Sequence, residues 1–208
     1  MDITYTDFMV YLVDDDEAIR DSLTSLIKSA GLNIKSFESA ETFLKNYFPD
    51  QAGCLILDVR MPVMTGLELQ DALAKSSISI PIIFISGNAE IPDSAKAFRA
   101  GAVDFLEKPF DGTVLIERIH EAFNKDFKDK KQRLEKNHIE KCFANLTSRE
   151  KEVLQLIISN HSNKEAAKKL GVSHRTIEAH RARIMEKMQV ENIAALVMLS
   201  LNYSLFSE

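Results

Sequence analysis

Cysteine is scarce in this sequence of 208 residues, and long apolar runs are absent from it. The two cysteines, Cys54 and Cys142, lie far apart, so the sequence indicates neither a disulfide framework nor a zinc site. No apolar run approaches the roughly 18 residues of a membrane-spanning helix. The first residues include Asp2 and Asp7 and no basic stretch, which is unlike a signal peptide. From these absences we expect a cytoplasmic protein with reduced thiols and no membrane partner.

Proline and glycine are nearly absent from the second half of the chain. All five prolines and six of the seven glycines lie at or before Gly112. Residues 1–125 hold 11 basic and 20 acidic residues, a net charge of −9, whereas residues 126–144 and 145–208 each carry a net charge of +2. This division indicates two domains. We expect the first at residues 6–125, a helical linker at 126–144 and the second at 145–208.

In the first domain, short β-like runs alternate with amphipathic segments. The expected strands are residues 8–13, 32–37, 54–58, 81–86 and 102–107. The expected helix starts are Ser39, Thr65 with Glu68 as a capping box, and the segment after Pro92. Strands that alternate with helices form a parallel sheet covered on both faces. We therefore expect an α/β fold, a doubly wound (βα)5 domain.

Polar residues stand at the carboxyl ends of these expected strands, where ligands bind in doubly wound sheets. Asp14 and Asp15 end the first strand, and Asp58 ends the third. Three carboxylates at one sheet edge would suit a hard divalent cation, most simply Mg²⁺. Ser86 and Lys108 end the fourth and fifth strands, and a hydroxyl with a lysine suits a phosphoryl group.

A family resemblance is carried by four segments of the first domain, "VDDDEAIRDSL", "LILDVRMPVMTGLEL", "FISGNAE" and "AGAVDFLEKPF". Over residues 8–125 the chain resembles the receiver domain of two-component response regulators. The resemblance implies that Asp58 accepts a phosphoryl group from a sensor histidine kinase. It also implies that Asp14, Asp15 and the carbonyl of Arg60 hold Mg²⁺ together with Asp58.

The same resemblance implies roles for three further side chains. Lys108 would pair with the acyl phosphate, Ser86 would supply a hydroxyl that moves towards it, and Phe105 would be the aromatic that reorients. An aromatic residue on a strand also suits a plain core position. Lys96 and Arg99, on the fourth helix, are candidates for a dimer face and equally for a solvated one.

The sequence of the second domain predicts an all-α helix-turn-helix fold. Its expected helix starts are Thr147 with Glu150, Ser162 with Glu165, and Ser173. Gly171 would make the tight turn between the second and third helices. The segments "LTSREKEVL", "SNKEAAKKLGVS" and "RTIEAHRARIMEKM" resemble the LuxR-type DNA-binding domain of FixJ-like response regulators. The resemblance implies that residues 173–187 enter the major groove of promoter DNA.

The LuxR-type resemblance also implies which side chains meet DNA. Those expected near base edges are Glu178, Ala179, Ala182 and Arg181. Those expected at phosphates are Lys164, Thr176, His180 and Arg183. A solvated helix face would carry several of these charges as well. His174, Ala166 and Gln189 depart from the family pattern, which leaves the preferred DNA sequence open; a left-handed backbone at Gln189 would cost about 1 kcal/mol.

Together the two resemblances imply a transcription regulator controlled by phosphorylation. Phosphorylation would either favour a homodimer or release a docked DNA-binding domain. The regulator would then bind promoter double-stranded DNA and most often activate transcription, with RNA polymerase as a further candidate partner. We expect a phosphoacceptor regulator that assists its own phosphorylation and dephosphorylation, and no other enzyme activity.

Two other classes of protein share some of these features. A phosphatase with an aspartyl-phosphate intermediate would carry a second Asp two residues after the nucleophile, where this chain has Arg60. A transcription factor controlled by a ligand or a protein contact could retain Asp58 as a vestige. The intact pair Asp14–Asp15, with Ser86 and Lys108, argues against that class.

Overall fold

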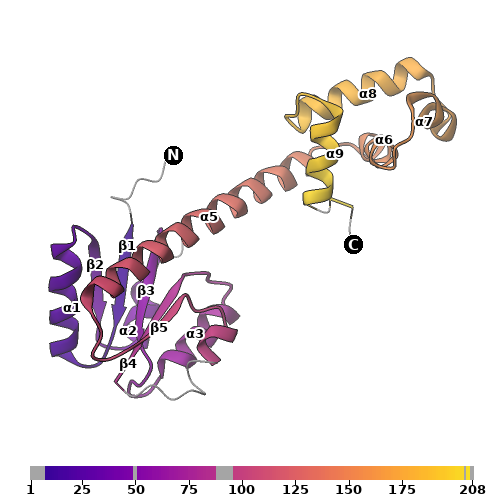
Figure 1. The fold of residues 1–208 in the computed structure, drawn as a ribbon. Helices are drawn as coiled ribbons and strands as arrows, with labels where there is room; N and C mark the ends of the chain where they lie inside the picture. The colour runs from indigo at the N-terminus through magenta and orange to yellow at the C-terminus, as the bar shows by residue number, and fades with distance from the viewer. Residues whose placement is uncertain (1–7, 49–50, 88–95, 204, 207–208) are drawn as a thin grey trace. The chain divides into compact units, whose positions relative to one another are not determined.

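The structure is a computed structural model that describes residues 8–48, 51–87, 96–203 and 205–206. The chain divides after Lys130 into two compact units (Figure 1). Among the described residues, no helix is long and apolar enough to cross a membrane. Cys54 and Cys142 are buried free thiols.

The first unit is built on a five-stranded parallel sheet with the strand order β2-β1-β3-β4-β5. Its strands are β1 (Met9–Val13), β2 (Asn33–Phe37), β3 (Gly53–Asp58), β4 (Ile82–Ser86) and β5 (Asp104–Glu107). Its helices include α1 (Glu17–Ser29), α2 (Ala40–Asn46), α3 (Gly66–Lys75) and the start of α5 (Gly112–Ala144). The prediction of a doubly wound parallel sheet is confirmed. The expected helix start after Pro92 lies outside the described residues, and residues 96–99 are helical.

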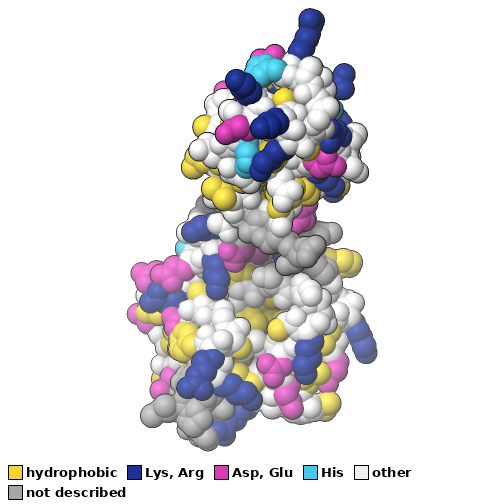
Figure 2. All heavy atoms as spheres, turned by 90° about the vertical axis from the view of Figure 1, so that its right-hand side faces the viewer, with side chains coloured by type: hydrophobic (Ala, Val, Ile, Leu, Met, Phe, Trp, Pro, Cys, Tyr) yellow, Lys and Arg dark blue, Asp and Glu magenta, His cyan; other side chains and the backbone are white. Residues whose placement is uncertain are grey.

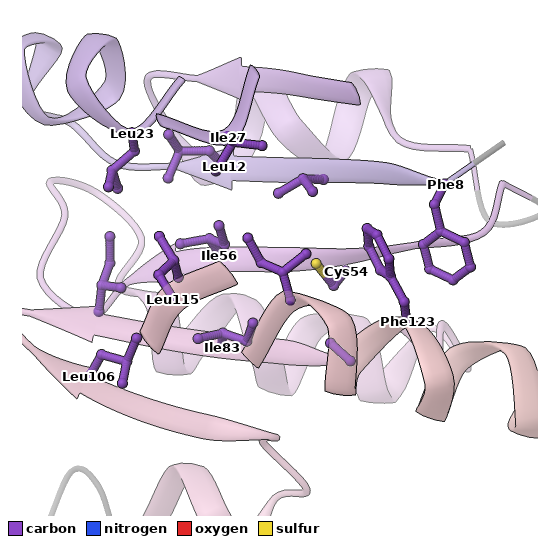
Figure 3. Packing of buried hydrophobic residues seen from close by; sticks show 14 of the residues in the cluster. Phe8, Leu12, Leu23, Ile27, Cys54, Ile56, Ile83, Leu106, Leu115 and Phe123 are labelled. Carbon is purple, nitrogen blue, oxygen red and sulfur yellow. The ribbon is translucent and has the colours of Figure 1, made fainter. Parts of the chain in front are cut away.

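Buried side chains cover both faces of the sheet. On one face, Leu23 and Ile27 of α1 and Leu115 of α5 pack against strand residues such as Leu12 and Ile56 (Figure 3). On the other face, helices α2 and α3 supply the apolar side chains. Every residue of β3 is buried, as a central strand between two helix layers requires. In the part of the chain that the structure describes, helices cover both faces of the central strands, and the buried polar residues of β3 and β4, Asp58 and Ser86, lie at strand ends.

Local capping explains where the helices of the first unit begin. Asp16 is the N-cap of α1 and accepts hydrogen bonds from Ala18 N at 2.8 Å and Ile19 N at 3.3 Å. Ser39 caps α2, and Thr65 forms the expected capping box of α3 with Glu68. These starts were predictable because each depends on residues at most three positions apart.

Helix α5 runs without interruption for 33 residues, through the expected linker 126–144. Near the boundary of the first unit it carries a buried ion pair, with Lys130 Nζ 2.9 Å from Asp126 Oδ2. The same Asp126 oxygen accepts from Gly53 N at 3.0 Å, and Lys130 Nζ donates to Gln51 O at 2.8 Å. These contacts tie α5 to the amino-terminal end of β3.

The second unit is helical. It contains the end of α5, then α6 (Ser148–Ile158), α7 (Asn163–Leu170), α8 (His174–Lys187) and α9 (Ile193–Asn202). The expected capping boxes at Thr147 and Ser162, the cap at Ser173 and the left-handed Gly171, with φ 65°, are all present. The helix-turn-helix prediction is confirmed.

Two further residues of the second unit have left-handed backbone. They are Asn160, with φ 59°, and Gln189, with φ 55°. Asn tolerates a left-handed backbone well, whereas Gln189 carries its steric cost. Ala166, a departure from the family pattern, is buried in the core of this unit with Leu154 and Ile177.

Candidate functional site

Four polar residues of the first unit lie at the carboxyl end of the sheet. Asp58 ends β3, Ser86 ends β4, and Asp14 and Lys108 directly follow β1 and β5. In the sheet, β1 and β4 flank β3, so their ends lie on either side of Asp58. Lys108 Nζ lies 2.7 Å from Asp58 Oδ1 and 2.7 Å from Asp14 Oδ2.

The two carboxylates are buried and held by backbone groups. Asp14 is 1% exposed and Asp58 is 6% exposed. Asp14 Oδ1 accepts from Asp16 N at 2.9 Å, and Asp58 Oδ2 accepts from Arg60 N at 2.7 Å. Each carboxylate therefore has one oxygen bound to Lys108 and the other bound to the backbone of the following loop.

The negative charge of Asp14 and Asp58 is only partly neutralised by Lys108. Burial raises the pKa of Asp58, and the nearby charge of Asp14 adds to this, although Lys108 opposes both effects. For Lys108, burial lowers the pKa, but the hydrogen bonds and charges of Asp14 and Asp58 outweigh burial and raise it. One ammonium is shared by two buried carboxylates, so the site would gain from a further positive charge.

The oxygen ligands fit a magnesium ion in part. Asp14 and Asp58 come together through Lys108, whereas Asp15 is solvent-exposed beside them. Within the described ranges, no group of three or more His, Cys, Asp or Glu side chains is arranged to hold a metal. Mg²⁺ usually keeps several waters and binds through one or two carboxylates, so the pair Asp14 and Asp58 suits it.

The remaining expected residues of the first unit lie close to this site or on its neighbouring strand. Ser86 is buried, and its carbonyl accepts from Lys108 N at 2.7 Å. Phe105 is half-buried on β5 and faces Phe84 of β4, with 6.1 Å between the ring centroids. Lys96 and Arg99 are exposed on the short helical stretch 96–99.

In the second unit, helix α8 separates a buried face from an exposed one. Ile177 and Ile184 are fully buried. The exposed side chains of α8 recur every three or four residues and are His174, Arg175, Glu178, Ala179, Ala182, Arg183 and Glu186. In Figure 2, the face of this unit turned to the viewer carries several Lys, Arg and His side chains. The exposed residues of α8 form a solvent-facing surface, the outer face of α8, opposite Ile177 and Ile184.

Not every expected DNA contact lies on that outer face. Arg181 is half-buried and donates a hydrogen bond to Asn163 Oδ1 of α7. Thr176 shares a hydrogen bond of 2.8 Å with Ser173 Oγ, and His180 is half-buried. Lys164 is exposed near the start of α7.

The sequence placed Arg175 away from the core without assigning it to DNA, and it gave no role to Asn163 of α7. Arg175 is exposed one helical turn before Ala179, so the spacing of three and four residues puts it beside an expected base contact. Asn163, which holds Arg181, could not be found in this way because the two residues lie on different helices.

An ion pair with a buried carboxylate joins two helices of the second unit. Lys187 Nζ lies 2.7 Å from Glu150 Oε2, and the Glu150 side chain is 4% exposed. The hydrogen bond from Lys187, with help from the Thr147 cap, lowers the pKa of Glu150 to about 2. The pair fixes the start of α6 to the end of α8.

Two family models match the chain. The model for the response regulator receiver domain matches residues 10–120, and the model for bacterial regulatory proteins of the luxR family matches residues 144–200. These matches, together with Lys108 shared by Asp14 and Asp58, define a two-domain signalling regulator with a receiver domain followed by a LuxR-type regulatory domain.

Individual relatives are similar over nearly the whole chain. The response regulator protein TmoT of Ectopseudomonas mendocina is 41% identical over 189 residues, covering 91% of this chain and 86% of TmoT. The transcriptional regulatory protein FixJ of Rhizobium meliloti is 40% identical, covering 94% of this chain and 96% of FixJ. The solved structure of the response regulator StyR matches with a TM-score of 0.87 at 41% identity, covering 95% of this chain and 100% of that one.

The chain belongs to the response regulators of two-component systems that join a receiver domain to a LuxR-type regulatory domain, as in FixJ.

Proposed function

We propose that this response regulator binds promoter DNA under the control of a phosphoryl group on Asp58. The observation that carries this proposal is the position of Lys108 Nζ, 2.7 Å from Asp58 and 2.7 Å from Asp14. Asp58 is a buried carboxylate that a single neighbouring cation does not fully neutralise, at the sheet end where ligands bind.

Phosphorylation requires Asp58 to act as the nucleophile. One of its carboxylate oxygens attacks the phosphorus of a phosphohistidine on the sensor kinase, and the bond from phosphorus to the histidine nitrogen breaks. Lys108 stabilises the charge that gathers on the phosphoryl oxygens. When bound through Asp14, Asp15, Asp58 and the carbonyl of Arg60, Mg²⁺ would neutralise charge on the same oxygens. By the same means the receiver would assist its own phosphorylation and dephosphorylation.

The phosphorylated state would be read by the residues that flank Asp58. An acyl phosphate adds roughly two negative charges, which attract Lys108 and the Ser86 hydroxyl. Lys108 would then favour the phosphoryl oxygens over Asp14. Phe105, half-buried on the strand next to Ser86, would reorient as that hydroxyl moves.

DNA contact would use the outer face of α8 together with half-buried residues of α8 and Lys164 of α7 beside it. We assign Glu178, Ala179 and Ala182 to base edges with Arg181 beside them, and Lys164, Thr176, His180 and Arg183 to phosphates. We add Arg175, which is exposed on the same face. Because the net charge of residues 145–208 is only +2, one copy should bind weakly, and a homodimer on a two-fold site would combine two such contacts.

We further propose the limits of the domains and the cellular setting of the protein. We place the receiver at residues 6–125, the linker at 126–144 and the DNA-binding domain at 145–208. The protein would act in the cytoplasm on promoters, most often as an activator, with RNA polymerase as a further partner.

The experiment that tests this function compares Asp58→Ala with Asp71→Ala. Asp71 is an exposed carboxylate on α3 and serves as the control. With acetyl phosphate and Mg²⁺, the wild type and Asp71→Ala should gain an acid-stable, hydroxylamine-labile phosphoryl group, and Asp58→Ala should gain none. With beryllofluoride, light scattering should show a dimer only for the first two proteins. Equal phosphorylation of Asp58→Ala would contradict the assignment, and a wild type insensitive to both reagents would favour control by a ligand or a protein contact.

A further inference from the structure

A side-chain contact joins the first residue of α7 to the flank of α8. Arg181 Nη1 donates a hydrogen bond to Asn163 Oδ1, across two helices that pack together through buried residues such as Ala167 and Ile177. Asn163 and Arg181 are both half-buried. The contact therefore restricts the rotamers of Arg181 and fixes where its guanidinium lies.

Asn163 is itself placed by the local structure at the start of α7. It directly follows Ser162, the N-cap of that helix. Ser162 N donates to Glu165 Oε2 at 2.8 Å, and Ser162 Oγ accepts from Glu165 N at 3.3 Å, which completes a capping box. The acceptor for Arg181 thus stands on a defined helix end, and a side chain that orients another needs such a rigid support.

The partner of Arg181 is a neutral amide, not a carboxylate. Arg149 shows the other arrangement, because its Nη1 lies 2.7 Å from Glu152 Oε2. A carboxylate orients a guanidinium and cancels its charge, whereas an amide orients it and leaves the charge whole. Arginine has several N–H donors in a planar fork, and Asn163 takes one of them. Arg181 therefore keeps its positive charge and further donors, which suits an anionic oxygen.

Arg181 lies away from the centre of the outer face of α8. It follows the buried Ile177 by one turn and points to α7, whereas Ala179 and Ala182 are exposed on the outer face. When a helix-turn-helix docks on DNA, its second helix enters the major groove and its first helix crosses the sugar-phosphate backbone. A guanidinium held at the start of α7 would therefore meet the DNA backbone.

We propose that Asn163 is a positioning residue that holds Arg181 for contact with one phosphate of the DNA. This inference rests on the proposed DNA binding, and it narrows the place of Arg181 from the base edges to the phosphate beside them. A guanidinium that is oriented in advance loses less side-chain entropy on binding than a freely rotating one. Asn163 thus raises the affinity for DNA through Arg181, equally for every base sequence.

The test measures DNA binding by the full-length protein with beryllofluoride and Mg²⁺, on a duplex that the wild type selects from a random pool. Fluorescence anisotropy gives Kd for this duplex and for duplexes with single base-pair changes, over a series of salt concentrations. The variants are Asn163→Ala, Arg181→Ala and the double variant. Asn163→Asp keeps an acceptor for Arg181 but cancels its charge. Arg133→Ala, at an exposed position of α5 outside the helix-turn-helix, is the control.

For Arg181→Ala we expect Kd to rise about tenfold on every duplex, and the slope of log Kd against log salt to fall by about 0.9 for each bound subunit. Asn163→Ala should raise Kd about fivefold in the wild type and less than about twofold in Arg181→Ala, because it acts through Arg181. Asn163→Asp should raise Kd at least as much as Asn163→Ala, without a lower melting temperature. Arg133→Ala should stay within about twofold of the wild type.

Each other outcome contradicts a separate part of the proposal. Equal losses from Asn163→Ala with and without Arg181 would overturn the positioning role, and so would wild-type affinity in Asn163→Asp or in Asn163→Ala. A loss confined to one base-pair position would overturn the phosphate contact and assign Arg181 to a base edge. If the wild type selects no duplex at all, the proposed DNA binding fails, and the role of Asn163 fails with it.

Discussion

Lysine meets buried carboxylates in both units, with opposite electrostatic results. Lys187 serves one carboxylate, and the pKa of Glu150 falls to about 2. Lys108 is shared between Asp14 and Asp58, and the pKa of Asp58 is raised because burial outweighs the half-share of one ammonium. The first arrangement is complete and stabilises the helical unit. The second retains excess negative charge, which is suited to a further cation and a transferable phosphoryl group.

The largest expected effect is on the incomplete site. Lys108→Ala should slow phosphorylation by acetyl phosphate about a hundredfold, because the ammonium that stabilises the phosphoryl oxygens is lost. Lys75→Ala, at an exposed position near the end of α3, is the control and should leave the rate unchanged. Initial rates from phosphate-affinity gels measure both. A Lys108→Ala rate equal to that of Lys75→Ala would show that the Lys108 ammonium does not stabilise the transferred phosphoryl group.

The complete pair should make the second unit sensitive to acid. Because the folded pKa of Glu150, about 2, lies below its ordinary value of 4.5, the pair contributes stability above pH 4.5 that is lost as the pH falls through 2. The free energy of unfolding of α6 and α8 should be about 2 kcal/mol smaller at pH 3 than at pH 6. Amide hydrogen exchange of these helices measures it.

The acid test has an internal comparison. Glu150→Gln should remove this pH dependence, and Glu152→Gln, in an exposed pair with Arg149, should retain it. The pH dependence of stability has the opposite sign at Asp58. Because the pKa of Asp58 is raised in the folded state, its carboxyl group stabilises the fold at low pH, and this stabilisation is lost as the pH rises through the folded pKa. If Glu150→Gln loses as much stability in acid as the wild type, the ion pair of Glu150 with Lys187 does not cause the acid sensitivity.

A third buried pair, Asp126 with Lys130, sharpens the comparison within the first unit. Asp126→Asn leaves Lys130 buried without its partner charge and should lower the free energy of unfolding of the first unit by about 2 kcal/mol. Phosphorylation by acetyl phosphate should stay within about twofold of the wild type, because the pair lies at the opposite end of the sheet. Asp129→Asn, at an exposed position one turn from Lys125, is the control for denaturant unfolding. A large loss of phosphorylation in Asp126→Asn would break the distinction between structural and functional pairs.

Sequence patterns located most elements because the relevant signals are local. The capping boxes at Thr65, Thr147 and Ser162 involve residues three positions apart, and each begins a helix where expected. The strand ends were placed within two residues, which was enough to bring Asp14, Asp58, Ser86 and Lys108 to one edge of the sheet. The limits of the domains and the DNA contacts stay predictions.

The sequence by itself determined the two-domain composition, the alternation of strands and helices, and the residue types that end the strands. Only the tertiary structure decided that Lys108 is shared by Asp14 and Asp58 and that Asp15 stays exposed. It also decided that Lys187 reaches Glu150, 37 positions away in the sequence. The positive φ of Val63 likewise appears only in the structure. Periodicity and capping depend on neighbours within a turn of helix or a pair of strand residues. Burial and ion pairing depend on which distant segments pack together, and that is decided when the whole chain closes its core.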